Sequence, residues 1–273
     1  MVSWSLNGVG MDRYVVQRGT LWRPAVSVRA NLVTVPGRHG VINADSAPSF
    51  DEPQVVLVLA ALGGEGDLEA AQSELTGLLS LPGLSVARTA GGVTASAPAR
   101  LVSVAVGDYW PGQAAVFTVT LALPTVFLRG PVGTSAAVAF VSDRTVEVPH
   151  LGVSSGPVTD AVVRVSGPVS VVSVTDVVTG TGLSVSGAGL ASGSYLYLDA
   201  GRLRAWRTTN SAAWTPSGTD VSSLLDYPAA GVLQVWARMR DVDPGDRVAA
   251  VMMHGSGRAQ TTTVAVRAAP SYL

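Results

Sequence analysis

The chain has 273 residues, a net charge of −1, 47% hydrophobic residues and only 14% charged residues. It contains no cysteine, which excludes disulfides and thiolate metal sites, and it has no basic excess that would attract nucleic acid. Its apolar runs are far shorter than the roughly 20 residues of a spanning helix, so we expect no membrane insertion.

The first fifty residues alternate short apolar runs with turns. They predict strands at Tyr14–Gln17, Ala25–Val28 and Asn31–Val35. The sequence VPGRHGV follows, with a glycine on each side of Arg38 and His39. Glycine tolerates conformations that other residues avoid, so this pattern predicts a tight turn or an arm whose backbone approaches a neighbour closely.

The pattern changes between residues 54 and 83. Gln54–Leu62 is an apolar run of strand length. From Asp67 to Leu81, leucines and alanines recur every three or four residues, which predicts an amphipathic helix that begins at Asp67 and ends before Pro82. Its polar side carries Glu69, Gln72, Ser73 and Thr76. Gly77 weakens a helix, so we interpret it as a position of close packing against a strand.

Alternating residues resume after the helix. Val93–Ala97, Ala99–Val106 and Gln113–Leu123 are predicted strands, and Asp108–Gly112 is a predicted turn. Pro124–Pro131 interrupts the pattern. We therefore predict a first domain over residues 1–130 and a second over residues 131–273.

The second half contains only short strand patterns separated by Gly, Asp, Pro and Ser. One of them is Val232–Arg238, and Ser222–Leu225 is the one weak helical turn. Regular short strands with such turns are typical of a β-sandwich. Trp206 and Trp236 lie in apolar runs and are expected in the core, whereas Trp214 lies in a polar loop and is the aromatic expected to be exposed.

One sequence matches a catalytic motif. Gly152-Val-Ser154-Ser-Gly156 has the G-x-S-x-G form, and an Asp and His254 follow it. A nucleophile elbow needs a strand before the serine and a helix after it, but Pro157 and a strand pattern follow here. We therefore interpret Ser154 as a turn residue and expect no enzyme.

Metal and cofactor sites are also not expected. Asp241–Asp246 has carboxylates near calcium spacing, but it lacks the distant bidentate Glu. His39, His150 and His254 lie far apart and have no ligand partner at helical spacing. No glycine-rich nucleotide motif is present.

Several segments together resemble the distal tail proteins of siphophages. The first half carries VPGRHGV, one helix in a β-rich domain, and LALPTVFLRGP; the second carries SGPVTDAVVRVSGP, LLDYPAAG and DVDPGDRVAAVMMHGSGRAQTTTVAVRAA. The resemblance implies a mainly β chain, with a tail-tube-like belt sandwich that contains one α-helix and a galectin-like sandwich after it.

The same resemblance implies a structural virion protein of a long non-contractile tail, made in the host cytoplasm. It would form a homo-hexameric ring at the tail tip and contact the tail tube protein, the tape measure protein, the baseplate hub and a receptor-binding protein. A compact second half without an inserted module gives no reason to assign ligand residues.

Two further expectations concern surfaces. We expect Arg38, His39 and the polar side of the helix, Glu69, Gln72, Ser73 and Thr76, to contact a neighbouring copy. The alternative function is a carbohydrate-binding adhesin, in which an exposed Trp214 would stack on a sugar ring.

Overall fold

The computed structural model describes residues 2–21, 26–29, 32–33, 42–43, 49–239 and 246–272. This part is mainly β, as predicted, with a single α-helix among the described residues. It divides into two compact units: unit 1 comprises Met1–Gly130 with Tyr272–Leu273, and unit 2 comprises Pro131–Ser271. The predicted second domain had included the last two residues. Within the described ranges, no helix combines the length and hydropathy needed to cross a membrane.

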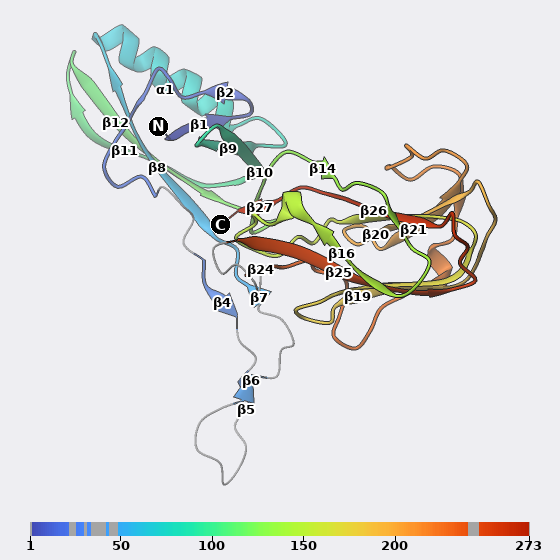
Figure 1. Ribbon diagram of the computed structural model, residues 1–273. Coiled ribbons are helices and arrows are strands. Elements are labelled where there is room, and N and C mark those ends of the chain that lie inside the picture. Colours follow the sequence, from blue (N-terminus) through green and yellow to red (C-terminus); the bar gives the residue numbers. More distant parts are fainter. Residues whose placement is uncertain are drawn as a thin grey trace. The chain divides into compact units, whose positions relative to one another are not determined.

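Unit 1 contains two large β-sheets and two short two-stranded pairs (Figure 1). The six-stranded sheet has the order β2 (Val9–Gly10), β1 (Val2–Leu6), β9 (Ser85–Ala90), β10 (Val93–Pro98), β13 (Leu128–Arg129), β27 (Ser271–Tyr272). The four-stranded sheet has the order β11 (Arg100–Trp110), β12 (Ala114–Ala122), β8 (Gln54–Leu62), β3 (Val15–Val16). Two short pairs join β4 (Val28–Arg29) to β7 (Ser49–Phe50) and β5 (Leu32–Val33) to β6 (Ile42–Asn43). The prediction of a strand at Gln54–Leu62 is confirmed.

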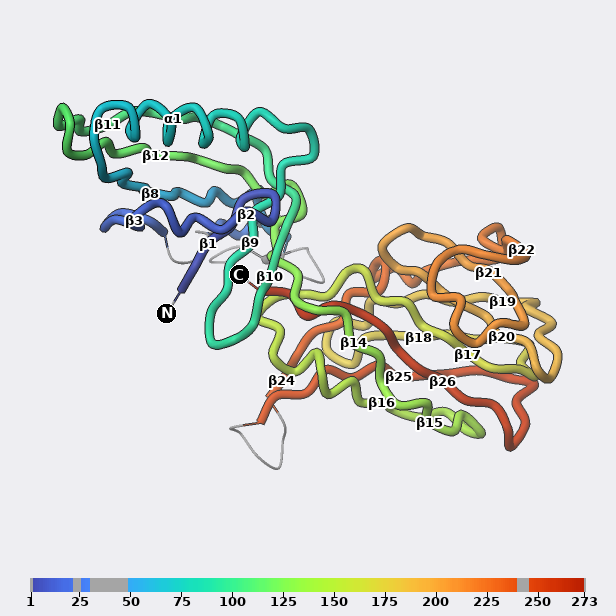
Figure 2. The backbone as a smooth tube through the Cα atoms, turned by 90° about the horizontal axis from the view of Figure 1, so that it is seen from above, coloured from blue at the N-terminus to red at the C-terminus, as the bar shows by residue number. Residues whose placement is uncertain are grey.

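Helix α1 (Glu65–Leu79) runs along one side of the four-stranded sheet (Figure 2). Its apolar side is buried as the periodicity predicts, in one core cluster with β8, β12 and β9. The buried helix residues are Leu68, Ala71, Leu75 and Leu79. Fully burying one leucine contributes about 1.5–3 kcal/mol, so this side fixes the helix to the sheet.

Two details of the helix prediction are wrong. The helix begins two residues earlier than predicted: Gly64 is the N-cap, and the carboxylate of Asp67 accepts a hydrogen bond from the Gly64 N–H at 3.1 Å. Gly77 does not mark close packing, because a Cβ at this position would meet no atom within 4 Å. Gly77 lies on the solvent-exposed side of the helix.

One flank of α1 is closed by the segment that precedes β3. The buried Tyr14 donates its hydroxyl to the Ala71 carbonyl at 2.7 Å and meets Phe117 edge-to-face at 6.5 Å. The neighbouring Arg13 pairs with Glu74 at 2.8 Å and reaches the Asp67 carbonyl. Burial, and then the Glu74 charge, raise the pKa of the Tyr14 phenol. The hydroxyl therefore stays protonated and donates.

Unit 2 is a sandwich of two antiparallel sheets. The seven-stranded sheet has the order β14 (Gly133–Thr134), β26 (Thr263–Ala268), β17 (Val162–Ser166), β20 (Tyr195–Asp199), β21 (Arg204–Thr208), β22 (Thr219–Asp220), with β15 (Val138–Ala139) also on β26. The six-stranded sheet has the order β16 (Arg144–Val148), β25 (Arg247–Ser256), β18 (Val169–Asp176), β19 (Gly182–Leu190), β23 (Leu225–Asp226), with β24 (Ala237–Met239) on β25. Alternate residues of both sheets form one core cluster.

The region before β24 differs from the prediction. The expected strand at Val232–Arg238 is reduced to two isolated bridges and the short β24. Asp176 holds this segment instead, because its carboxylate accepts hydrogen bonds from the Trp236 N–H at 3.0 Å and from Thr179. Trp236 is only partly buried, whereas Trp206 is in the interior as expected. The helical turn is present as η2 (Ser222–Leu224), and η1 (Pro149–Leu151) is a second 3₁₀ turn.

Candidate assembly surface

Strand β11 is the most unusual element of unit 1. All eleven of its residues are exposed, although six of them are large and apolar. It forms an edge of the four-stranded sheet, and among the described residues no strand pairs with its outer side. The exposed set is Leu101, Val102, Val104, Val106, Tyr109 and Trp110. A long apolar edge strand is a site for pairing with another chain.

The register shows which side these residues occupy. Val104 and Val106 lie directly opposite the buried Val119 and Phe117 of β12. Register shifts between Leu101 and Ser103 and between Val106 and Tyr109 insert extra residues into β11. Because directly opposite residues share a face, the core side of the sheet continues onto β11. We call this the β11 stripe: Leu101, Val104, Val106 and Tyr109.

The β11 stripe continues the core without a cover. Val119 and Phe117 are 0% and 1% exposed, whereas Val104 and Val106 directly opposite them on β11 are 41% and 53% exposed. The prediction of a turn at Asp108–Gly112 is wrong in its first part, because the bulge lets β11 run on to Trp110. Sequence reasoning missed Tyr109 and Trp110 for this reason.

A groove separates the stripe from the helix. It is lined on one side by Val106 and Tyr109 and on the other by α1 residues that include Glu69 and Gln72. Phe117 and Ala115 of β12 also line it. The open flank of α1 therefore combines an apolar floor with an acidic rim.

The predicted interface residues fall into two groups. Glu69, Gln72, Ser73 and Thr76 are all exposed on α1, and only the first two reach the groove. Arg38 and His39 lie outside the described residues, as does Asp241–Gly245 of the candidate cation loop. The role of these two segments stays a prediction.

Ser154 is buried in unit 2 and hydrogen-bonded to the backbone. The side chain is 1% exposed, and its hydroxyl accepts a hydrogen bond from the Ser271 N–H at 3.2 Å. A Cβ on the nearby Gly152 would collide with the carbonyl of Arg247, at the start of β25. His254 lies seven residues further along β25, about 23 Å at roughly 3.3 Å per residue. Ser154 and His254 therefore do not form a catalytic pair.

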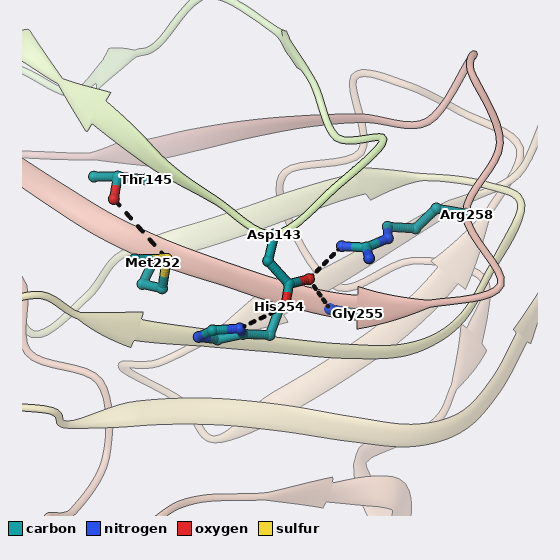
Figure 3. A network of polar contacts seen from close by, with 6 residues as sticks. All are labelled: Asp143, Thr145, Met252, His254, Gly255 and Arg258. Carbon is teal, nitrogen blue, oxygen red and sulfur yellow. Dashed lines mark hydrogen bonds and ion pairs between the residues drawn. The ribbon is translucent and has the colours of Figure 1, made fainter.

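His254 instead belongs to a small polar network (Figure 3). Asp143 lies between His254 Nδ1 at 3.0 Å and the Arg258 guanidinium at 2.5 Å, and it also accepts from the Gly255 N–H. The hydrogen bond from His254, and then that from Arg258, lower the pKa of Asp143 to about 2. This network ties the turn before β16 to the end of β25. Asp143 lies 111 to 115 positions from its three partners in sequence, so no local motif reveals the network.

Trp214 is less exposed than predicted. It is partly buried, with the guanidinium groups of Arg164 and Arg267 at 5.1 and 5.7 Å from the ring centre and Tyr197 edge-on at 5.5 Å. The loop that carries it is held by Tyr197, which donates to the Asn210 carbonyl, and by Trp206, which donates to the Ala213 carbonyl. A pocket beside the ring also contains Asp160, Asp199 and Arg202. The ring faces cations within its own chain.

Comparison with solved structures identifies the fold. The chain is similar over 100% of both chains to the SPP1 Dit (gp 19.1) protein, described as a paradigm of the hub adsorption apparatus in phages that infect Gram-positive bacteria, with a TM-score of 0.61 and 16% identity. A chain of the phage P2 baseplate in its activated conformation with Ca aligns over 95% of this chain, with 8% identity and a TM-score of 0.42, which is too low to support a fold assignment. No protein-family model and no curated protein matches the sequence. The resemblance to siphophage distal tail proteins is confirmed for the fold.

Proposed function

We propose that this chain is a structural protein of a long non-contractile phage tail. Six copies form a ring at the tail tip, and the ring connects the tail tube to the baseplate and the host-adsorption apparatus. Unit 1 acts as the belt domain that builds the ring, and unit 2 acts as a galectin-like domain that carries neighbouring tail proteins, among them a receptor-binding protein. The protein resides in the virion.

The uncovered β11 stripe carries this proposal. A sheet whose core side continues for four apolar residues beyond its cover gains free energy when another chain covers it, at about 25 cal/mol per Å² of apolar surface. Closed assemblies leave no strand edge exposed, whereas an open edge of this length favours aggregation. The likeness to the SPP1 Dit fold supports placing this assembly in a phage tail.

The environments of Ser154 and His254 are also consistent with a structural role. The motif serine is buried and engaged with the backbone, and the histidine is engaged with Asp143 and lies far from it. Among the described residues, no group of three His, Asp or Glu side chains is placed to hold a metal ion. A structural role requires apolar strands that can pack together and few charges to desolvate, and this chain has both.

The experiment compares two charge insertions by size-exclusion chromatography with light scattering. Val106→Arg places a charge on the β11 stripe, and Val178→Arg places the same charge on an equally exposed valine of unit 2. Wild type and Val178→Arg are expected to assemble, while Val106→Arg remains a folded monomer with unchanged circular dichroism. Assembly of Val106→Arg at wild-type affinity would contradict the role of β11, and an absence of assembly in wild type would contradict the ring.

A further inference from the structure

The seven-stranded sheet of unit 2 carries a pocket on its outer face. The pocket has a volume of about 370 Å³, within the range of roughly 300–1,000 Å³ that small-ligand pockets occupy. Its floor is Val162, which lies opposite Asp199 of β20 on one side and opposite Arg267 of β26 on the other. Directly opposite residues share a face, so all three side chains point to the side on which the pocket lies.

Trp214 forms a fixed wall of this pocket. Its loop is held by the buried Trp206, whose Nε1 donates to the Ala213 carbonyl at 3.1 Å, and its ring lies edge-on to Tyr197 at 5.5 Å. The Arg267 guanidinium lies 5.7 Å from the centre of the Trp214 ring, which holds this arginine at the pocket. The wall is therefore in place before any ligand binds, as in most small-ligand sites.

Asp199 has a carboxylate oxygen that is left without a hydrogen bond. The residue is only 4% exposed, and its Oδ1 accepts from the Arg202 N–H at 3.0 Å. Its Oδ2 lies 3.7 Å from Arg202 Nη1, which is too long for a hydrogen bond, and no other described residue donates to it. A buried acceptor without a donor is costly, so this oxygen marks the position of a donor from outside the chain.

The charges around the pocket indicate what kind of ligand fits. Two carboxylates, Asp160 and Asp199, and two guanidinium groups, Arg202 and Arg267, line it, so a charged ligand that gains at one pair is repelled by the other. The free Oδ2 of Asp199 and the Arg202 guanidinium place an acceptor beside a donor. A hydroxyl group donates and accepts at once, whereas an ammonium group only donates and a carboxylate only accepts. An uncharged ligand with several hydroxyl groups therefore matches the pocket.

From these observations we propose that the pocket binds one ring of a neutral saccharide. One hydroxyl donates to Asp199 Oδ2 and accepts from Arg202, a second accepts from Arg267, and the C–H groups of the ring contact Val162 and Trp214. The site lies within unit 2 and does not depend on the ring of six copies. Only the source of the saccharide rests on the proposed function: at a tail tip it is a glycan of the host surface.

Saturation-transfer NMR and titration of the full chain test the site. The probes are the neutral methyl glycosides of glucose, galactose, mannose, N-acetylglucosamine and rhamnose, and the charged comparators are glucose 6-phosphate and glucosamine. Asp199→Asn and Arg202→Gln each remove one polar group of the pocket. Arg204→Gln is the matched control, because Arg204 is also exposed and lies two positions further on but does not line the pocket. Circular dichroism establishes that each variant is folded.

At least one neutral glycoside is expected to bind at millimolar concentration and to bind more tightly than the two charged comparators. Its dissociation constant should rise about tenfold or more in Asp199→Asn and in Arg202→Gln, and stay unchanged in Arg204→Gln. Absence of binding to wild type, or equal binding by wild type and the two pocket variants, would overturn the site. Tighter binding of a charged comparator would overturn the neutral ligand. Light scattering of the same wild-type sample reads the ring separately, so either proposal can fail alone.

Discussion

The two flanks of α1 bury tyrosines very differently. On the β3 side, Tyr14 is 5% exposed and donates to a helix carbonyl; on the β11 side, Tyr109 is 48% exposed beside an open groove. Both tyrosines lie by the same helix and the same sheet. Unit 1 therefore completes its core on the β3 side of α1 and leaves it open on the β11 side, which is the side that we propose another copy covers.

The strongest test of this comparison truncates the closed flank. Tyr14→Ala should lower the free energy of unfolding by about 3–5 kcal/mol, because it removes a buried aromatic ring and leaves a cavity beside Phe117. Urea unfolding followed through the helical circular dichroism signal measures the loss. A loss below about 1 kcal/mol would mean that the flank is not part of the core.

A smaller change isolates the hydroxyl. Tyr14→Phe should cost about 1 kcal/mol, the value of one buried hydrogen bond. The raised pKa of Tyr14 also predicts a pH effect: its contribution is complete below pH 10, the ordinary phenol value, and is lost as pH rises toward the folded pKa, because the unfolded chain ionises first. Unfolding midpoints across alkaline pH should therefore fall more steeply in wild type than in Tyr14→Phe. Parallel curves would refute the buried donor.

A substitution on the solvent-exposed side of α1 should instead raise the free energy of unfolding. Gly77→Ala should raise the stability of the monomer by about 0.5–1 kcal/mol, since alanine favours the helix and the new methyl group meets no neighbour. The same urea experiment reads the gain. A destabilised variant would indicate contacts on this side that the isolated chain does not contain.

The smallest expected change in monomer stability is that of Tyr109→Ala, on the open flank of α1. Tyr109→Ala should change the unfolding free energy of the dilute monomer by no more than about 0.5 kcal/mol, because half of the side chain is already in solvent. The same substitution should weaken assembly in light scattering. A large loss of monomer stability would erase the contrast with Tyr14 and remove the reason to assign β11 to an interface.

The sequence predicts each flank of α1 only in part. The stripe of Leu68, Ala71 and Leu75 follows from helical periodicity, so the helix and the side that it buries are predictable. Tyr14 joins this core through a contact 57 positions away, which no local pattern contains. The strand at Ala99–Val106 is predicted, but the residues that share one face of β11 are not, because its two bulges shift the alternation so that Leu101 and Val104, three positions apart, share a face.

Unit 2 shows the same limit. Its strands could be predicted from alternation, but the environments of Trp214 and His254 depend on partners brought together by the fold. The Trp214 ring is enclosed by cations from β17 and β26, and His254 meets Asp143 across 111 positions. The local sequence favours an exposed Trp214 and a His254 without a partner. Tertiary contacts decide both.

In the proposed ring, copies of unit 1 cover one another's open flanks and leave no sheet edge exposed. Electron microscopy of the purified full chain at high concentration tests it most directly, through the symmetry of averaged particle images. Closed rings of six copies are expected for wild type, and separate single particles are expected for Val106→Arg. Single particles for wild type at every concentration, or open filaments in place of rings, would contradict it.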